Sequence, residues 1–216
     1  MLKKVLLYIF VFFISFVLFF AFTFPIDRLL YSKLVELGAE ADSVKGNLFH
    51  IEIKNLKYKL FKGDKIDVKN QLFTAVITLD NKIFININPF TRTFELKTSQ
   101  TEIHRFLTKP LAKGQITAQL QGKIKEKKIL LDGNISLFLK ENKIFPEKNI
   151  NVKVNIKNKN SVSASINSKN LDIQFNGRLE LPLNVNNASL KGQITGKIYG
   201  LKTRKNVFFK LNNLKF

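Results

Sequence analysis

The chain contains no cysteine, and its 216 residues include only two histidines. Without cysteine there are no disulfides, no thiolate metal sites and no cysteine nucleophile. The two histidines, His50 and His104, do not stand in the spacing of a metal-binding motif such as H-E-x-x-H or H-x-H. We therefore predict no metal site, and we expect no cofactor.

Acidic residues are also few, and the sequence lacks the motifs of common catalytic centres. Its 16 Asp and Glu are scattered, with no D-x-D, no G-x-S-x-G and no S-x-x-K pattern. A glycine-rich phosphate loop between a strand and a helix is missing as well. We therefore predict that the protein is not an enzyme.

The few acids stand against 36 Lys and Arg, which gives a formal net charge of +20. Such a surface attracts phosphates of any origin. An AT-rich coding sequence also produces abundant Lys, Asn, Ile and Phe, so the composition leaves open whether this charge is functional. Aromatic residues such as Phe175 and Phe209 fall on the apolar phase of their segments, and no RNA-stacking motif is present. We predict no nucleic-acid partner.

One long apolar segment, VLLYIFVFFISFVLFFAFTF at residues 5–24, contains no charged residue. At about 1.5 Å per residue, a helix of this length spans the roughly 30 Å hydrocarbon core of a bilayer. The segment is longer than the apolar part of a cleavable signal peptide, about 7 to 15 residues, and it ends in Phe and Pro. We therefore predict a retained membrane anchor at residues 1–25, with these residues in the bilayer: Val5, Phe12, Phe16, Phe20 and Phe24.

Lys3 and Lys4 favour a cytoplasmic N-terminus, which would place everything after the anchor in the periplasm. Residues 26–40 then carry leucine and isoleucine at helical spacing, with Pro25 suited to a first turn and Gly38 to a C-terminal cap. We predict a short amphipathic helix here. It either lies on the membrane surface or extends the membrane helix with one face packed on the domain.

From Leu48 onward the dominant period is two, as where Ile150, Val152, Val154 and Ile156 alternate with Asn and Lys. This alternation predicts strands with one apolar and one wet face. Turn signals favour an antiparallel meander, and we place them at Asp132-Gly133, Asn142-Lys143 and Asn186-Asn187. A phase slip at Asn55 predicts a β-bulge, and residues 99–109 are the one short helix expected in this region.

Together these patterns predict a mainly β protein, in which the membrane helix and the amphipathic helix precede a curved antiparallel β-sheet at residues 41–216. No amphipathic helix long enough to cover the strands of residues 114–216 is present. The sheet must therefore close on itself as a sandwich, jellyroll or half-barrel, pack against another protein, or keep an open apolar groove.

A repeated stretch marks the face in question: GQITAQLQG at residues 114–122 returns as GQITGKIYG at residues 192–200. Alternation places the glycines of both copies on the apolar side. Missing side chains there let a strand bend, let another layer approach, or leave room for an acyl chain. We therefore select the candidate lining of a groove or a core from these copies: Ile116, Ala118, Leu120, Ile194, Gly196 and Ile198.

Residues 20–58, FAFTFPIDRLLYSKLVELGAEADSVKGNLFHIEIKNLKY, resemble the GspN family, subunit N of type II secretion systems. In this stretch an apolar helix ends in Phe-Pro, a leucine-rich helix follows, and a Gly-x-Leu strand leads into IKNLKY. The later strands GQITAQLQGKI, DGNISLFLK and LKGQITGKIYG are more loosely similar to AsmA-like envelope proteins. LptC-like proteins share the plan of one anchor and a β-jellyroll.

The resemblance implies a non-enzymatic accessory component of type II protein secretion, anchored in the inner membrane, with other secretion or envelope-assembly proteins as partners. The alternative is a carrier or bridge for phospholipid or lipopolysaccharide along a hydrophobic β-groove. In that alternative, Lys on the outer face or rim meets anionic head groups. The two functions differ in whether the apolar strand faces are closed into a core or bind lipid.

Overall fold

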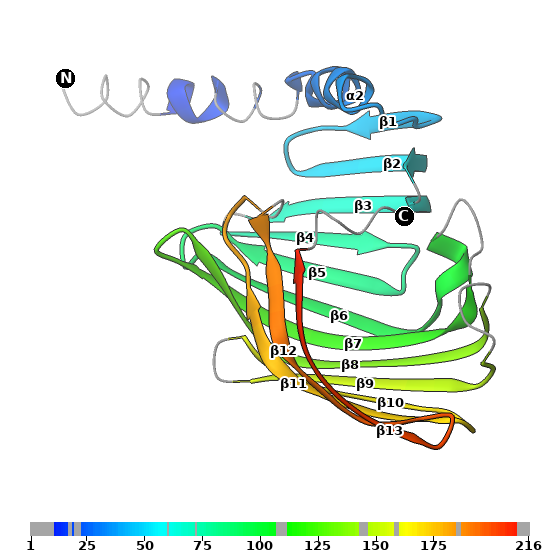
Figure 1. The fold of residues 1–216 in the computed structure, drawn as a ribbon. Helices are drawn as coiled ribbons and strands as arrows, with labels where there is room; N and C mark the ends of the chain where they lie inside the picture. The colour runs from blue at the N-terminus through cyan, green and yellow to red at the C-terminus, as the bar shows by residue number, and fades with distance from the viewer. Residues whose placement is uncertain are drawn as a thin grey trace.

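The computed structural model describes residues 11–16, 19, 23–59, 61–71, 73–106, 112–142, 147–157, 160–184 and 187–210. This part of the chain forms one antiparallel sheet of thirteen strands, which lie in the sheet in the same order as in the sequence (Figure 1). A meander of this kind needs only short connections between neighbours. The predicted mainly β, antiparallel architecture is confirmed. The described residues make one open sheet and not the two packed sheets of a sandwich or jellyroll.

The strands differ in length, and two short hairpins lie between longer neighbours. Their bounds are β1 (Ser43–Gly46), β2 (His50–Tyr58), β3 (Phe61–Gln71), β4 (Thr74–Leu79), β5 (Ile83–Asn88), β6 (Thr93–Glu102), β7 (Ala112–Lys125), β8 (Lys128–Asn142), β9 (Ile150–Lys157), β10 (Ser161–Asn167), β11 (Leu171–Glu180), β12 (Ser189–Ile198) and β13 (Leu201–Lys210).

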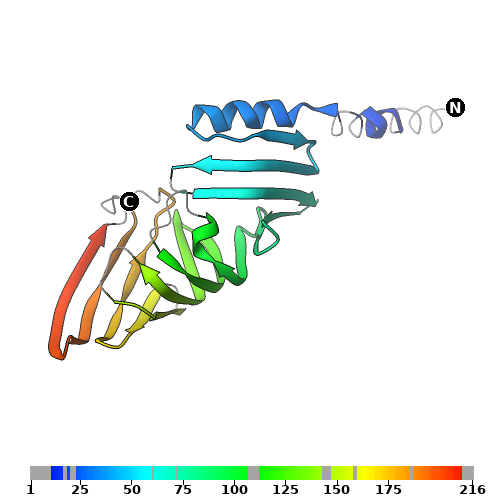
Figure 2. The ribbon, with the colours of Figure 1, turned by 90° about the vertical axis from the view of Figure 1, so that its right-hand side faces the viewer.

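The sheet is strongly bent. In Figure 1, β12 and β13 rise in front of β5 to β8, and Figure 2 shows the same strands from the side, with β13 at the far left. β1 to β3 form the opposite end of the sheet, beside the N-terminal helix. The two sides of the sheet are therefore different places: an inner side that the strands curve around, and an outer side that faces away.

The short hairpin of β9 and β10 contributes to this bend. Beyond its turn, β8 and β11 pair directly with each other: the N–H of Ile129 donates to Leu181 O at 2.7 Å, and the N–H of Leu183 donates to Lys127 O at 3.0 Å. The same two strands stand three steps apart at their other ends. Strands that converge at one end and separate at the other force the sheet out of a plane.

Asn160 fills the point where β8 and β11 converge. Its side chain accepts from the N–H of Leu131 at 2.6 Å and donates to Ile129 O at 2.8 Å, while its own C=O accepts from the N–H of Leu179 at 2.9 Å. The residue is 5% exposed and has a positive φ of 81°. Asparagine tolerates this left-handed conformation better than most residues do, so one side chain satisfies the backbone of both strands.

The two edges of the sheet are unlike. Helix α2 (Ile26–Glu36) lies along β1, the first strand (Figure 1). The helix ends in the capping pattern that was expected at Gly38, which has φ 75° and donates to Val35 O at 2.9 Å, while Ala39 donates to Leu34 O at 2.8 Å. The last strand, β13, pairs only with β12 within the described residues. One edge is covered by a helix and the other is open.

One predicted turn is wrong: Asp132-Gly133 lies in the middle of β8, where Gly133 has φ 142°. Turns instead lie at Asp80-Asn81, Glu126-Lys127 and Tyr199-Gly200, where both residues have positive φ. This is the backbone of the tight hairpin turn that matches the twist of the flanking strands. At the first of these turns, the Asp80 carboxylate also accepts from the N–H of Lys65 at 2.7 Å.

The other local predictions have mixed outcomes. Asn55 interrupts the regular strand backbone with φ 53°, at the position of the predicted phase slip. The helix predicted at residues 99–109 is shorter than expected, because residues 99–102 continue β6 and only η1 (Ile103–Phe106) is helical; residues 107–111 lie outside the described part. The breaks expected near residues 142–143 and 186–187 do fall between strands.

The predicted anchor lies largely outside the described residues, which omit Val5 and Phe20. Residues 11–16 are helical, with Phe12 72% exposed and Phe16 55% exposed, and Phe24 is half-buried. Among the helices in the described ranges, none combines the length and the apolar character that crossing a bilayer requires.

We predict that Asn160→Ala lowers the free energy of unfolding by about 1–3 kcal/mol, because it leaves the N–H of Leu131 and the C=O of Ile129 without partners. Asn160→Gly, which adopts positive φ freely, should lose the amide contacts alone and be less damaging. Chemical denaturation of the full chain in detergent measures both. Ser163→Ala, on the exposed side of the same hairpin, is the control, and an Asn160→Ala variant as stable as that control contradicts the assignment.

Candidate functional site: the apolar face of the sheet

Strand pairing brings apolar residues into rows that cross the whole sheet. The first row takes one residue from each strand, and every member is Gly, Val, Ile or Leu. In order from β1 to β13 they are Gly46, Ile51, Val68, Ile77, Ile85, Leu96, Leu120, Gly133, Ile156, Val162, Gly177, Gly192 and Val207. We call the side of the sheet that carries this row the apolar face.

A second row runs beside the first, two residues away along each strand. Its members from β1 to β13 are Val44, Ile53, Ile66, Leu79, Ile83, Thr98, Ala118, Ile135, Val154, Ala164, Phe175, Ile194 and Lys205. The row is apolar except for one threonine and its last member, a lysine. An apolar strip two residues wide therefore continues across all thirteen strands.

The residues between these rows point to the other side and are mostly hydrophilic. From β7 to β13 they are Gln119, Asn134, Asn155, Ser163, Asn176, Gln193 and Asn206. A hollow on this side, over β8 to β11, is lined mainly by such amides and by serines and one lysine. The two sides of the sheet thus separate cleanly into an apolar face and a polar face.

The apolar face lies on the inner side of the bend. Its cluster of most buried side chains is Ile156, Val162 and Phe175, which are 4%, 7% and 9% exposed, and side chains from β7 to β13 pack against them. No second layer covers these residues within the described ranges. Side chains in a single layer reach such burial where curvature brings them together, which is the inner side.

Most of this face is nevertheless half-buried and not closed. Ile135, Val154 and Ile194 each keep part of their surface exposed, as do Ile166 and Ile173 in the next row. A face of this size that remains partly open is more than the scattered apolar residues normal on a monomer surface. The bend gathers the apolar side chains and stops short of enclosing them.

The residues selected from the repeated stretch all lie on this face, as expected. Ile116, Ala118 and Leu120 come from β7, and Ile194, Gly196 and Ile198 come from β12. Ala118 is 6% exposed and Ile198 is 36% exposed. The two sets are five strands apart in the sheet, so they occupy different parts of one face and do not meet in a common pocket.

Glycines in the first row serve as seats for large apolar side chains. The ring of Phe175 lies over Gly177 and Gly192, so a Cβ on either glycine would collide with that ring. In the same way the ring of Phe94 lies over Gly122, and Leu79 lies over Gly63. Such a ring covers the backbone that a glycine exposes. These contacts fill the inner side of the bend without adding a second layer.

Other glycines on the face are required by the backbone itself. Gly133 and Gly196 have φ of 142° and 146°, and a Cβ on either would strike the main chain of the neighbouring strand. Gly114 lies at a register shift between β7 and β8, and Gly200 forms the β12–β13 turn. The glycines of the two repeated copies therefore do four different jobs, which their identical spacing conceals.

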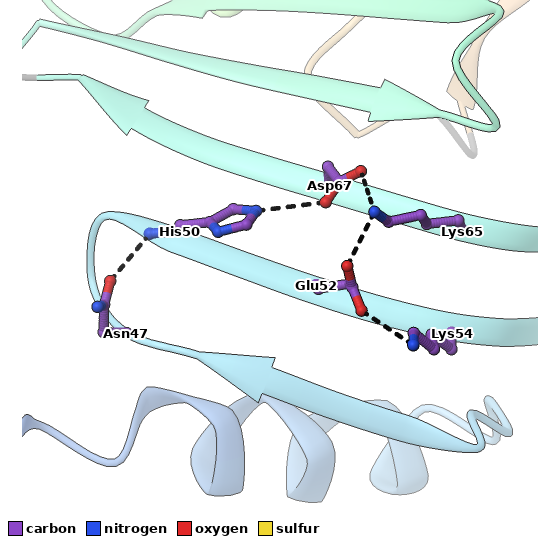
Figure 3. Close-up of polar contacts among 6 residues, drawn as sticks. All are labelled: Asn47, His50, Glu52, Lys54, Lys65 and Asp67. Atoms are coloured by element: carbon purple, nitrogen blue, oxygen red, sulfur yellow. Dashed lines mark hydrogen bonds and ion pairs between the residues drawn. The ribbon is translucent and has the colours of Figure 1, made fainter.

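The polar face carries a charged cluster on β2 and β3 (Figure 3). Lys65 Nζ lies 2.9 Å from Glu52 and 3.2 Å from Asp67, and Lys54 Nζ lies 3.3 Å from Glu52. His50 Nε2 lies 3.3 Å from Asp67. Hydrogen bonds from Lys65 and Lys54 lower the pKa of Glu52, and those to Glu52 and Asp67 raise the pKa of Lys65. Each group holds its ordinary charge more firmly, so the cluster fastens two strands together.

The largest hollow on the polar face, over β4 to β8, contains two carboxylates, Glu95 and Asp132, on either side of Gln121. Glu95 pairs with Lys97 at 2.8 Å, which lowers the pKa of its carboxyl. A general acid needs a raised pKa. In the described part of the chain, no three His, Asp or Glu residues gather as a metal site would require.

A further polar cluster ties three connections together at one end of the sheet. Glu147 is 7% exposed and accepts from Asn170 at 2.7 Å and from Ser168 at 3.0 Å. The hydrogen bond from Asn170 contributes most to lowering its pKa, and Ser168 and Tyr199 add to the effect. Loss of solvent and the hydrogen bond to Glu147 raise the pKa of Tyr199. This carboxylate holds the β10–β11 and β12–β13 turns and has a structural role.

Sequence reasoning missed Phe175, Phe94 and Lys205 as residues of the face. Parity along β13, where Leu201, Thr203, Val207 and Phe209 share the face with Lys205, was the signal that could have identified the lysine. The rings could not have been found that way, because their seats lie on neighbouring strands and depend on register.

The fold and this face define a class: an open, single-sheet antiparallel β protein with a continuous apolar inner face. Compared with protein-family models, with curated proteins and with solved structures, the chain shows no match.

We predict that Gly122→Ala is destabilising by about 1–3 kcal/mol through overpacking, and that a second change, Phe94→Leu, recovers part of the loss. The nearest atoms to the new methyl group belong to the Phe94 ring, which a smaller side chain removes. Gly133→Ala is the matched comparison, since its obstacle is the main chain of Gln119 and Leu120. Denaturation midpoints should show no rescue of Gly133→Ala by Phe94→Leu, and equal behaviour of both glycines contradicts the assignment.

We predict that Glu52→Gln lowers the thermal midpoint near neutral pH, and that its difference from the natural chain disappears on acidification. Glu52 has a lowered folded pKa, so its contribution is present above the unfolded value of about 4.3 and is lost as the pH falls through the folded value. Circular dichroism of the full chain in detergent, at about pH 7 and about pH 3, measures this. Glu126→Gln, at a side chain 81% exposed, is the control and should differ little at either pH. A difference that grows in acid argues against the ion-pair role.

Proposed function

We propose that this protein is a non-enzymatic, lipid-handling protein of the cell envelope that holds acyl chains against the apolar face. The observation that carries this proposal is the uninterrupted apolar strip across thirteen strands, with no second layer over it in the described residues. Apolar contact is non-directional and takes any hydrocarbon chain. Such a surface suits a carrier that accepts lipids of varied chain structure.

The dimensions of the strip agree with transport along it. Twelve steps of about 4.8 Å between thirteen strands give roughly 58 Å along the bend. One leaflet of a bilayer contributes roughly 15 Å of hydrocarbon, half of the total core. The strip is therefore several times longer than the acyl part of one lipid. A chain can move from row to row without leaving apolar surroundings.

The partial exposure of the face is what a guest would use. Ile135, Val154 and Ile194 already pack on one side and keep part of their surface free. Burying apolar surface contributes about 25 cal/mol per Å², so an acyl chain laid on these side chains stabilises itself and the sheet. A fully closed core would leave no such surface to cover.

We propose further that the protein is anchored in the inner membrane with the sheet in the periplasm. Support comes from the uncharged residues 5–24 and from α2, whose apolar residues Leu29 and Val35 are 52% and 56% exposed. Helices with one exposed apolar side lie readily at a membrane surface. This arrangement would place the β1 end of the sheet next to the source of lipid.

A second candidate function is an accessory role in type II protein secretion, as the resemblance to GspN implies. The open edge of β13 favours it, because a free strand edge can accept a strand from a partner protein. Loss of the protein would then impair the export of secreted enzymes and leave the outer-membrane lipids unchanged. A carrier gives the reverse result.

We predict that a photocrosslinking amino acid placed at Ile135 captures lipid, while the same amino acid at Asn134 does not. The two residues are neighbours on β8, with Ile135 on the apolar face and Asn134 on the polar face. The full chain is irradiated in cells, purified, and examined by mass spectrometry for lipid adducts. We expect a several-fold excess at Ile135.

Equal capture at the two positions, or none at either, contradicts lipid binding by this face. Comparable expression of the two variants is the internal control. A substitution at Ile135 that prevents folding is recognised by loss of the protein itself. In that case the pair Val154 and Asn155 on β9 repeats the comparison, because these two residues also lie on opposite faces.

A further inference from the structure

Lys205 stands at a special place in the sheet. It is the last member of the second apolar row and the one ionisable residue in either row. Strand pairing puts it opposite Ile194, which in turn lies opposite Phe175 of the buried cluster. Its ammonium group thus lies at the open edge of the sheet, on the same face as the hydrocarbon strip.

The neighbours of Lys205 on this face are a hydroxyl and an apolar side chain. Thr203 lies two residues before it and is half-buried, and Val207 lies two residues after it and packs on the buried cluster. None of the ion pairs in the described part of the chain includes Lys205. A lysine without a carboxylate partner, next to a hydroxyl group, is able to bind an anion.

Two other basic residues of β13, Lys202 and Arg204, have the opposite parity and point to the polar face. They stand opposite Lys197 and Thr195, outside both apolar rows. β13 therefore offers a comparison within one strand: similar charge and similar exposure, but different faces. What distinguishes Lys205 is contact with the apolar strip and not charge as such.

We propose that Lys205, with Thr203, binds the anionic head group of a lipid whose acyl chains lie on the apolar strip. This inference rests on the proposed function and specifies its ligand class. A lipid has its charge at one end of its hydrocarbon chains, and the strip has its charge at one end of its apolar rows. The head group at the open edge stays in water, where an anion keeps most of its hydration, while the chains lie inward.

A lysine on the inner face of an edge strand has another known use, which is to prevent edge-to-edge aggregation. The two roles differ in what the charge recognises. A protective lysine acts on other copies of the chain and leaves bound lipid unaffected. A lipid-binding lysine changes which lipids are bound and leaves the association state unaffected.

The test compares the lipid class captured by four forms of the full chain: natural, Lys205→Gln, Lys205→Arg and Lys202→Gln. Each carries the photocrosslinker at Ile135 and is reconstituted in vesicles of equal parts phosphatidylglycerol and phosphatidylethanolamine. Mass spectrometry gives the ratio of anionic to zwitterionic adducts. We expect an excess of phosphatidylglycerol of about fivefold for the natural chain, Lys205→Arg and Lys202→Gln, as one basic residue near anionic lipid provides. Lys205→Gln should reduce the ratio to about one.

An unchanged ratio in Lys205→Gln overturns the inference while leaving lipid binding in place. Aggregation of Lys205→Gln with an unchanged ratio assigns the residue to edge protection, which overturns it too. An equal fall in Lys202→Gln also overturns it, because general surface charge would then explain the selection. Failure of the natural chain to form any adduct removes the proposed function itself, so the two failures are distinguishable.

Discussion

Every level of this structure depends on how one apolar face is kept from water without a second layer. A sheet of thirteen strands places half of its side chains on each side, and one of those sides is Gly, Val, Ile and Leu along an entire row. Helices are too few to cover it. The remaining solution is curvature, and the convergence of β8 with β11 around Asn160 and the seating of Phe175 over two glycines both increase it.

Curvature explains why the face is gathered but not sealed. Bending one layer brings side chains together most where the bend is tightest, which is where Ile156, Val162 and Phe175 are nearly buried. Away from that line the same kinds of residue stay half-exposed. The proposed function uses this gradient: the tight region holds the fold together, and the looser region remains available for hydrocarbon. Stability and binding are then two uses of one surface.

The alternation of apolar and polar residues was enough to predict the sheet, its antiparallel meander and the common face of Ile116, Ala118 and Leu120, because a period of two is a property of the strand alone. It was not enough to tell Gly133 in a strand from a glycine in a turn, since Asp-Gly has the same letters in either place. The seat of Phe94 on Gly122 and the position of Lys205 at the end of a row depend on register, which is set by neighbouring strands and by their bulges. Such relations exist between segments and are not visible within any one of them.

The difference between the two edges has a consequence for association between copies of the chain. A sheet with two open edges is able to grow without limit, as amyloid does. Here α2 occupies the β1 edge, so addition has only one place to occur. At that place a second copy would align Lys202, Arg204, Lys205 and Lys210 with the same four charges of its partner. The chain therefore behaves as a terminated segment, whose single free end rejects its own kind and stays available to something acidic.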